Sequence, residues 1–106
     1  MSNNIEILRD DFWVKVIEML QQNWALIEPM PSGDVCVYFV DDSSGVFDQL
    51  TFSSEKDAAF ALKLNGFSRF ADDKKLQSFL TPPSGPYYQR PHPNGPIYSS
   101  GQYWKS

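Results

Sequence analysis

The residues of this chain that are best suited to chemistry are few. The sequence contains one cysteine, Cys36, and one histidine, His92. Because an imidazole can activate a thiol as a nucleophile, a Cys36–His92 pair is one candidate site, provided that the C-terminal part of the chain crosses the predicted sheet. The alternative is a buried and unreactive thiol, which the apolar neighbours of Cys36 favour. With one cysteine and one histidine, the chain can form neither a disulfide within itself nor a zinc site that needs several cysteine or histidine ligands.

Three aspartates stand close together in the sequence, at Asp41, Asp42 and Asp48. Carboxylates in a loop can bind calcium, but residues 42–45 lack the alternating oxygen ligands and the closing glutamate of an EF-hand loop. The sequence also contains no glycine-rich phosphate-binding motif. We therefore predict no metal and no cofactor.

The charges are distributed unevenly along the chain. The net charge is −4, but residues 1–53 carry two bases and nine acids, whereas residues 54–106 carry seven bases and four acids. Either the two halves neutralise each other across the fold, or the first half presents an acidic face to a basic protein partner. Direct binding to nucleic acid is disfavoured, because phosphates require a cluster of lysines and arginines that the sequence lacks.

An acidic face of this kind needs aromatic anchors as well as charge. Carboxylates accelerate association with a basic partner, and buried aromatic side chains supply most of the affinity. The residues predicted to bind a partner are therefore Glu28, Asp34, Asp41, Asp42, Asp48, Tyr87 and Tyr88.

The elements that position these residues begin with a hairpin. Residues 35–41 and 46–53 are apolar and β-prone, and the polar stretch between them ends at Gly45, where a hairpin loop can use a positive φ. Residues 24–28 form a third strand candidate that ends at prolines. The sequence thus predicts an α+β fold with a three-stranded antiparallel meander.

Three helices are expected to cover this sheet. Apolar residues at helical spacing predict an N-terminal helix over about residues 11–23. A second helix is predicted over residues 54–65, with Ser54 as its N-cap and Asn65-Gly66 at its end. A short third helix is predicted over residues 72–80.

The composition changes after residue 80. Residues 81–106 contain six prolines and five aromatic residues, and no acid. Disordered tails are poor in aromatics, so this segment is predicted to be an ordered, extended strap that packs on a single domain comprising residues 1–106. A strap of this kind could also roof a small-molecule pocket, whose lining residues would be Cys36, His92, Tyr98 and Trp104.

Two classes of function remain open from these patterns. The first is a small acidic binding protein that acts by surface complementarity, as immunity proteins and antitoxins do against basic nucleases. The second is a small-molecule-binding protein or minor enzyme with a pocket beneath the strap. The N-terminus does not resemble a signal peptide, and no apolar stretch approaches the roughly 20 residues of a membrane span, so we expect a cytoplasmic protein without membrane contact.

Overall fold

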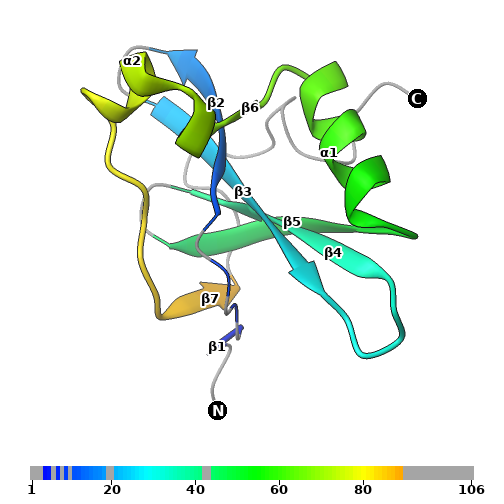
Figure 1. The fold of residues 1–106 in the computed structure, drawn as a ribbon. Helices are drawn as coiled ribbons and strands as arrows, with labels where there is room; N and C mark the ends of the chain where they lie inside the picture. Colours follow the sequence, from blue (N-terminus) through cyan, green and yellow to red (C-terminus); the bar gives the residue numbers. More distant parts are fainter. Residues whose placement is uncertain are drawn as a thin grey trace.

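The computed structural model describes residues 4, 5, 7, 9, 11–18, 21–41 and 44–89. These residues form a small mixed α+β domain with a sheet of seven strands in the order β1-β7-β5-β4-β3-β2-β6 (Figure 1). The strands are β1 (Asn4–Ile5), β2 (Trp13–Glu18), β3 (Gln21–Pro29), β4 (Val35–Val40), β5 (Gly45–Phe52), β6 (Ser68–Arg69) and β7 (Tyr87–Gln89). The helices are α1 (Glu55–Leu64), the short 3-10 helix η1 (Phe70–Asp72) and α2 (Lys74–Gln77).

The centre of the sheet is formed by β3, β4 and β5, which pair antiparallel in that order. They lie at the positions where the sequence predicted strands, but they do not form a separate three-stranded meander. Strand β2 pairs with the outer edge of β3, and β7 pairs in parallel with β5. The sheet is therefore larger than predicted. Strands β2 and β7 come from segments that were assigned to a helix and to a strap, and β1 and β6 add a short strand at each edge.

The predicted N-terminal helix over residues 11–23 is wrong. Residues 13–18 form β2, and residues 21–23 begin β3. The segment is rich in aromatic and β-branched side chains, which favour strands. Burial does not follow one helical side of this segment: the apolar Val16 is 41% exposed, whereas Val14 and the polar Asn23 are fully buried.

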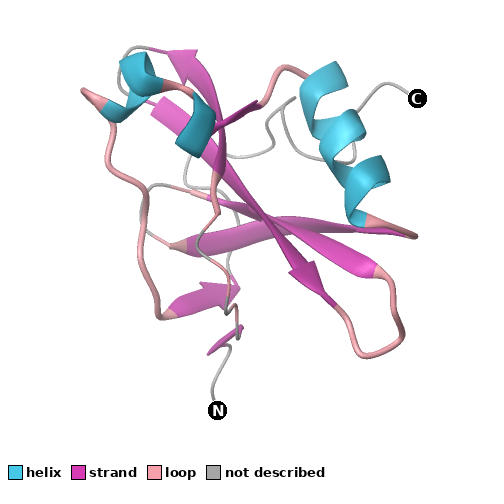
Figure 2. Ribbon diagram, in the orientation of Figure 1, coloured by secondary structure: helices cyan, strands magenta, loops and turns pink. Residues whose placement is uncertain are grey.

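Both faces of the sheet are covered, and alternation along β2 and β4 sends side chains to each of them. On one face, α1 packs Ala58 and Leu62 over Trp13 and Val37. On the other face, Trp24 makes edge-to-face contacts with Phe12 and Phe70, at centroid distances of 5.6 Å and 5.4 Å. Figure 2 shows α1 separated from the two short helices by the strands of the sheet. The domain thus has two apolar cores that share one sheet.

Helix α1 confirms the predicted helix over residues 54–65. The Ser54 hydroxyl accepts a hydrogen bond from the backbone N–H of Asp57, at 3.1 Å. At the other end Gly66 adopts a φ of +90°, and the N–H of Phe67 donates to the carbonyl of Leu62, at 2.9 Å. This is a Schellman turn, and it inserts Phe67 into the core beneath the helix.

The third predicted helix is shorter than the range 72–80. It is replaced by η1 and α2, and the side chain that caps α2 belongs to Asp73, whose carboxylate accepts from the N–H of Leu76. Leu80 is buried, but Phe79 is 60% exposed because the helix ends before it. None of the helices among the described residues is long and apolar enough to cross a membrane.

The β4–β5 hairpin loop differs from the prediction in one detail. Among the described residues of the loop, the one with positive φ is Ser44, at +68°, rather than Gly45. The Asp41 side chain accepts a hydrogen bond from the N–H of Gly45, and the Ser44 hydroxyl donates to the carbonyl of Ser84. These bonds stabilise the loop and hold residues 81–86 against it.

The described part of the predicted strap packs on the domain. Pro83 and Tyr87 are buried, and Tyr87 belongs to the second core with Val40 and Leu80. Strand β7 pairs antiparallel with β1 as well as parallel with β5. Residues 90–106 of the strap lie outside the described residues.

Gly66 and Gly33 give a matched test of the α1 cap. Both have a positive φ, +90° and +96°, but an added β-carbon at Gly66 would approach the Cε of Lys15 to 3.2 Å, whereas at Gly33 it would meet nothing within 4 Å. Lys15 donates to the carbonyl of Asn65 at 3.0 Å, and displacing it would lose this bond. We expect Gly66→Ala to lower the free energy of unfolding by about 1–2 kcal/mol, and by more than Gly33→Ala does. Equal denaturation midpoints for the two variants would contradict this account of the cap.

Candidate functional site

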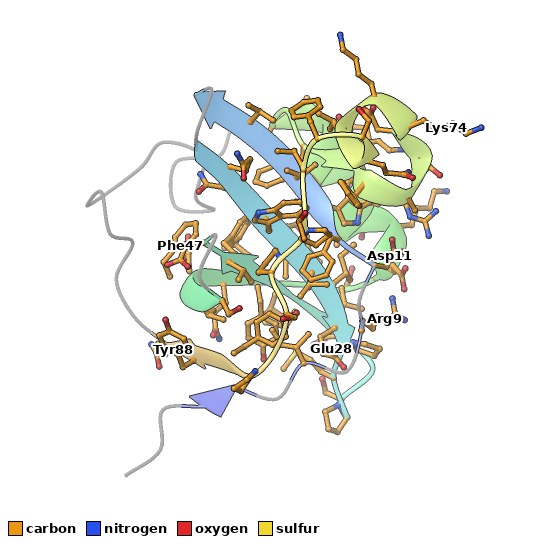
Figure 3. The ribbon with its side chains drawn as sticks, turned by 90° about the vertical axis from the view of Figure 1, so that its left-hand side faces the viewer. Arg9, Asp11, Glu28, Phe47, Lys74 and Tyr88 are labelled. Atoms are coloured by element: carbon orange, nitrogen blue, oxygen red, sulfur yellow. The ribbon has the colours of Figure 1, made fainter. Side chains whose placement is uncertain are left out.

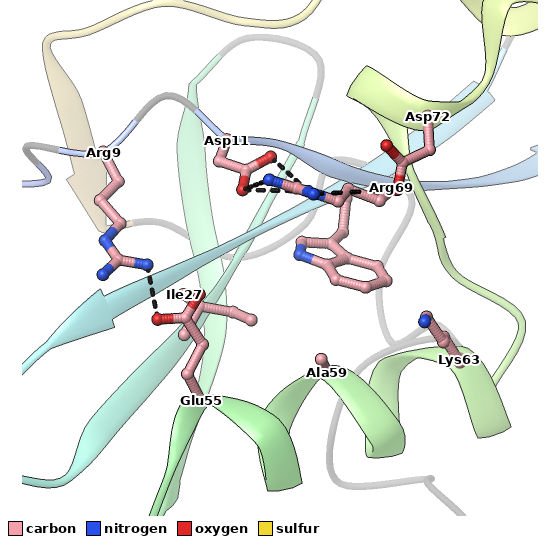
Figure 4. Close-up of a pocket in the computed structure, with 9 residues that line it drawn as sticks. Arg9, Asp11, Ile27, Glu55, Ala59, Lys63, Arg69 and Asp72 are labelled. Atoms are coloured by element: carbon pink, nitrogen blue, oxygen red, sulfur yellow. Dashed lines mark hydrogen bonds and ion pairs between the residues drawn. The ribbon is translucent and has the colours of Figure 1, made fainter.

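The described surface contains a cleft of about 250 Å³ between α1 and the strands β2 and β3. Its apolar lining consists of Trp13, Ile27 and Ala59. Its charged lining consists of three bases and three acids, which Figure 4 shows around the opening: Arg9, Lys63, Arg69, Asp11, Glu55 and Asp72. A hollow with an apolar floor and fixed charges at its rim is suited to binding a small polar group.

Several of the residues that line the cleft belong to α1 or follow the turn at its C-terminal end. Glu55, Ala59 and Lys63 are spaced four residues apart, so they follow one side of the helix. Ala59 has no side chain beyond its β-carbon, which leaves space between the charged residues on either side. After the Schellman turn, β6 pairs with β2 so that Arg69 lies opposite Trp13. This register brings Arg69 to the opening of the cleft.

Two ion pairs form the walls of the cleft. The Arg69 guanidinium contacts both carboxylate oxygens of Asp11, with nitrogen–oxygen distances of 2.7–3.1 Å, in the bidentate arrangement that fixes geometry best. The hydrogen bond to Asp11 and its charge raise the pKa of Arg69. At the other end, Arg9 Nη1 lies 2.9 Å from Glu55 Oε1. These four residues neutralise one another in pairs.

Lys63 and Asp72 are held less tightly. The Lys63 ammonium lies 5.9 Å from the centre of the Trp13 ring, and within the described part of the chain it has no carboxylate partner. Asp72 is 3.8 Å from Arg69, and its side chain is 71% exposed. A second, more open hollow of about 360 Å³ shares Lys63, Arg69 and Asp72 with the cleft. One cation and one carboxylate therefore remain accessible to a ligand here.

The outward side of α1 carries an apolar ridge. Phe60 is 68% exposed and Leu64 is 52% exposed, and they are one helical turn apart. Ala58 and Leu62 on the opposite side of the helix are fully buried. Large exposed apolar side chains that adjoin one another mark binding surfaces more often than isolated ones do. The name "α1 ridge" refers below to Phe60 and Leu64.

The predicted partner-binding acids are not gathered in one place. Asp34 precedes β4 and Asp41 follows it, so about 23 Å of strand separates them. Asp41 is buried in the hairpin loop, and Asp48 is half-buried and accepts a hydrogen bond from the N–H of Gln49. Glu28 is half-buried and accepts a bond from the backbone N–H of Arg9, which it adjoins in Figure 3. Asp42 lies outside the described residues.

The predicted tyrosines are brought to the same loop. Tyr87 is buried, whereas Tyr88 is half-buried and its N–H donates to the carbonyl of Ser44, at 3.2 Å. Tyr88 therefore lies beside the loop that contains Asp41. Among the described residues, this is the place where the structure brings an aromatic residue and an acid of the predicted set together.

Cys36 lies on the sheet face opposite α1, next to Tyr38. Burial raises the pKa of the Cys36 thiol, and a hydrogen bond with Tyr38 opposes this effect. The pKa of Tyr38 is also raised, first by burial and then by the neighbouring Cys36 and Glu28. The other predicted pocket residues, His92, Tyr98 and Trp104, lie outside the described residues.

The cleft residues were not identified from the sequence. None of the nine residues that line the cleft was among the site residues predicted from the sequence. The one local signal was a small residue, Ala59, flanked four residues away on each side by opposite charges at Glu55 and Lys63. In the part of the chain that the structure describes, no group of three or more histidine, cysteine, aspartate or glutamate side chains is arranged to hold a metal ion.

Comparisons with known proteins do not extend this description. No protein-family model matches the chain, and searches of curated proteins and of solved structures find no similar protein.

The raised pKa values of Cys36 and Tyr38 predict a loss of stability at alkaline pH. Burial holds both groups neutral above their ordinary pKa values of 9.0 and 10.0, so the unfolded state releases these protons first. Their contribution to stability is fully present below about pH 9 and is lost as the pH rises through the folded-state pKa values. Thermal melts between about pH 8 and about pH 11 should show a steeper fall in Tm for the wild type than for Cys36→Ala. Parallel curves for the two proteins would show that the thiol contributes nothing to this dependence.

Proposed function

We propose that this chain is a binding protein that acts by surface complementarity, with the α1 ridge as its contact with a protein partner. The observation that carries the proposal is the exposure of Phe60 and Leu64 on a helix whose other side is fully buried. Covering these two side chains in a complex would contribute roughly 1–2 kcal/mol each. An aromatic side chain of this kind, anchored on a rigid helix, is a common centre of binding energy.

The charge of the chain favours a basic partner. The net charge of −4 attracts a positively charged protein over a longer range than any single contact. Close to the ridge, α1 carries both signs, with Glu55 and Asp57 in its first turn and Lys63 in its last turn. The acidic net charge therefore speeds association, while the apolar ridge holds the complex. An immunity-type inhibitor of a basic, nuclease-like protein is the version of this proposal that the charge favours.

The α1 ridge can be tested without altering charge. Phe60→Gln and Leu64→Gln remove apolar surface and keep a residue that tolerates helices well. Phe79→Gln is the matched control, because Phe79 is 60% exposed but lies beyond α2. Each protein is immobilised and exposed to an extract of its source. We expect the wild type and Phe79→Gln to capture a basic protein. The double variant Phe60→Gln/Leu64→Gln should not capture it. Thermal melts should place the variants within about 0.5 kcal/mol of the wild type, since the side chains are exposed.

Two results would contradict the proposal. Equal capture of the basic protein by the wild type and the ridge variant would show that the ridge is not the contact. Sedimentation that reveals a dimer, dissolved by the ridge substitutions, would show instead that the ridge binds a second copy of the chain.

The charge component is tested separately by salt. Screening at about 0.5 M salt shortens the reach of charge to a few ångströms, so it should slow association of the captured partner while changing dissociation little. An association rate that does not depend on salt would show that the negative charge of the chain does not accelerate binding, and that the apolar contact acts alone.

A further inference from the structure

The cleft beside α1 is too small for a large ligand. Its volume of about 250 Å³ lies below the roughly 300–1,000 Å³ of pockets that enclose drug-sized molecules. It can hold one small molecule or a single side chain. The floor formed by Trp13, Ile27 and Ala59 is apolar, so it favours a molecule that is apolar in part.

The charges of the cleft are balanced. Three bases face three acids, and therefore neither a simple anion nor a simple cation is favoured by the net charge. The bidentate Arg69–Asp11 pair and the Arg9–Glu55 pair already satisfy each other. Asp72 is only loosely paired with Arg69, at 3.8 Å, and its side chain is 71% exposed. Lys63 and Asp72 lie at the end of the cleft opposite to Arg9 and Glu55 in Figure 4. A ligand thus meets one accessible cation and one accessible carboxylate beside an apolar floor.

The geometry points to a site for a free α-amino acid with an apolar side chain. Its carboxylate would bind the Lys63 ammonium, and its ammonium group would bind the Asp72 carboxylate, in two charge-assisted hydrogen bonds. Its side chain would lie over Ala59 and against Trp13, where the absence of a larger side chain on the helix leaves room. This site is separate from the α1 ridge, and it does not depend on a protein partner.

The ligand class is tested with probes that differ by one charge. L-Phenylalanine and L-leucine are titrated calorimetrically into the full chain, alongside 3-phenylpropionate, which lacks the ammonium group, and 2-phenylethylamine, which lacks the carboxylate. We expect at least one of the two amino acids to bind, and each single-charge analogue to bind about tenfold more weakly than phenylalanine or worse. Glycine, which cannot use the apolar floor, should also bind weakly.

The residues are tested with variants that keep the fold. Lys63→Met removes the cation and keeps an unbranched stem, and Asp72→Asn removes the carboxylate charge. Ala59→Leu fills the cleft from the helix. Each should weaken amino-acid binding about tenfold or more, whereas Lys56→Met, on the same helix but outside the cleft lining, should leave it unchanged. Thermal melts of every variant establish that it is folded.

Several results would overturn the proposal. One is that neither amino acid binds at about 10 mM, a concentration that would detect even weak sites. Another is that an analogue with a single charge binds as tightly as phenylalanine. A third is that a folded Lys63→Met variant retains full affinity. Phe60→Gln should leave amino-acid binding intact, so failure of this site and failure of the α1 ridge can be told apart.

Discussion

Phe12, Trp13 and Val14 point alternately to the two faces of the sheet, and the packing of both faces depends on this alternation. Phe12 and Val14 enter the core beneath the short helices, and Trp13 enters the core beneath α1. One short strand therefore ties both covering layers to the sheet. The carbonyl of Phe12 also accepts a hydrogen bond from the N–H of Phe70, at 2.9 Å, which fixes the start of η1. If this segment were a helix, neither layer would have its present partner.

The cleft follows from the same arrangement. With Trp13 facing α1, the helix can approach the sheet only as closely as its small residues allow. The Schellman turn then returns the chain to the edge of β2, where Arg69 meets Asp11. Lys15, from the same side of β2, donates to the carbonyl of Asn65 and secures the end of the helix. The walls, floor and opening of the cleft are thus consequences of how α1 is capped and joined to β2.

Local signals in the sequence predicted the central strands and α1 well. Ser54, Gly66 and the apolar runs of the hairpin each act through near neighbours, so a sequence pattern reveals them. The failure at residues 11–23 has a different cause. Apolar residues spaced for a helix can also alternate on a strand that is covered on both faces, and only pairing with β3 decides between them. The contacts of Arg69 with Asp11 and of Arg9 with Glu55 join residues 58 and 46 positions apart. No local pattern predicts pairs of this kind.

The most direct test of whether Trp13 lies on a strand beneath α1 is nuclear Overhauser spectroscopy on the full chain, which records the proton contacts of Trp13 in solution. The structure predicts contacts from the Trp13 indole to the side chain of Lys63, together with cross-strand backbone contacts between Trp13 and Ala25. Backbone contacts from Trp13 to residues three and four positions ahead, without cross-strand contacts, would instead show a helix. That result would contradict the cleft, the packing of α1 on the sheet and the proposed amino-acid site, because all three require Trp13 to lie on β2.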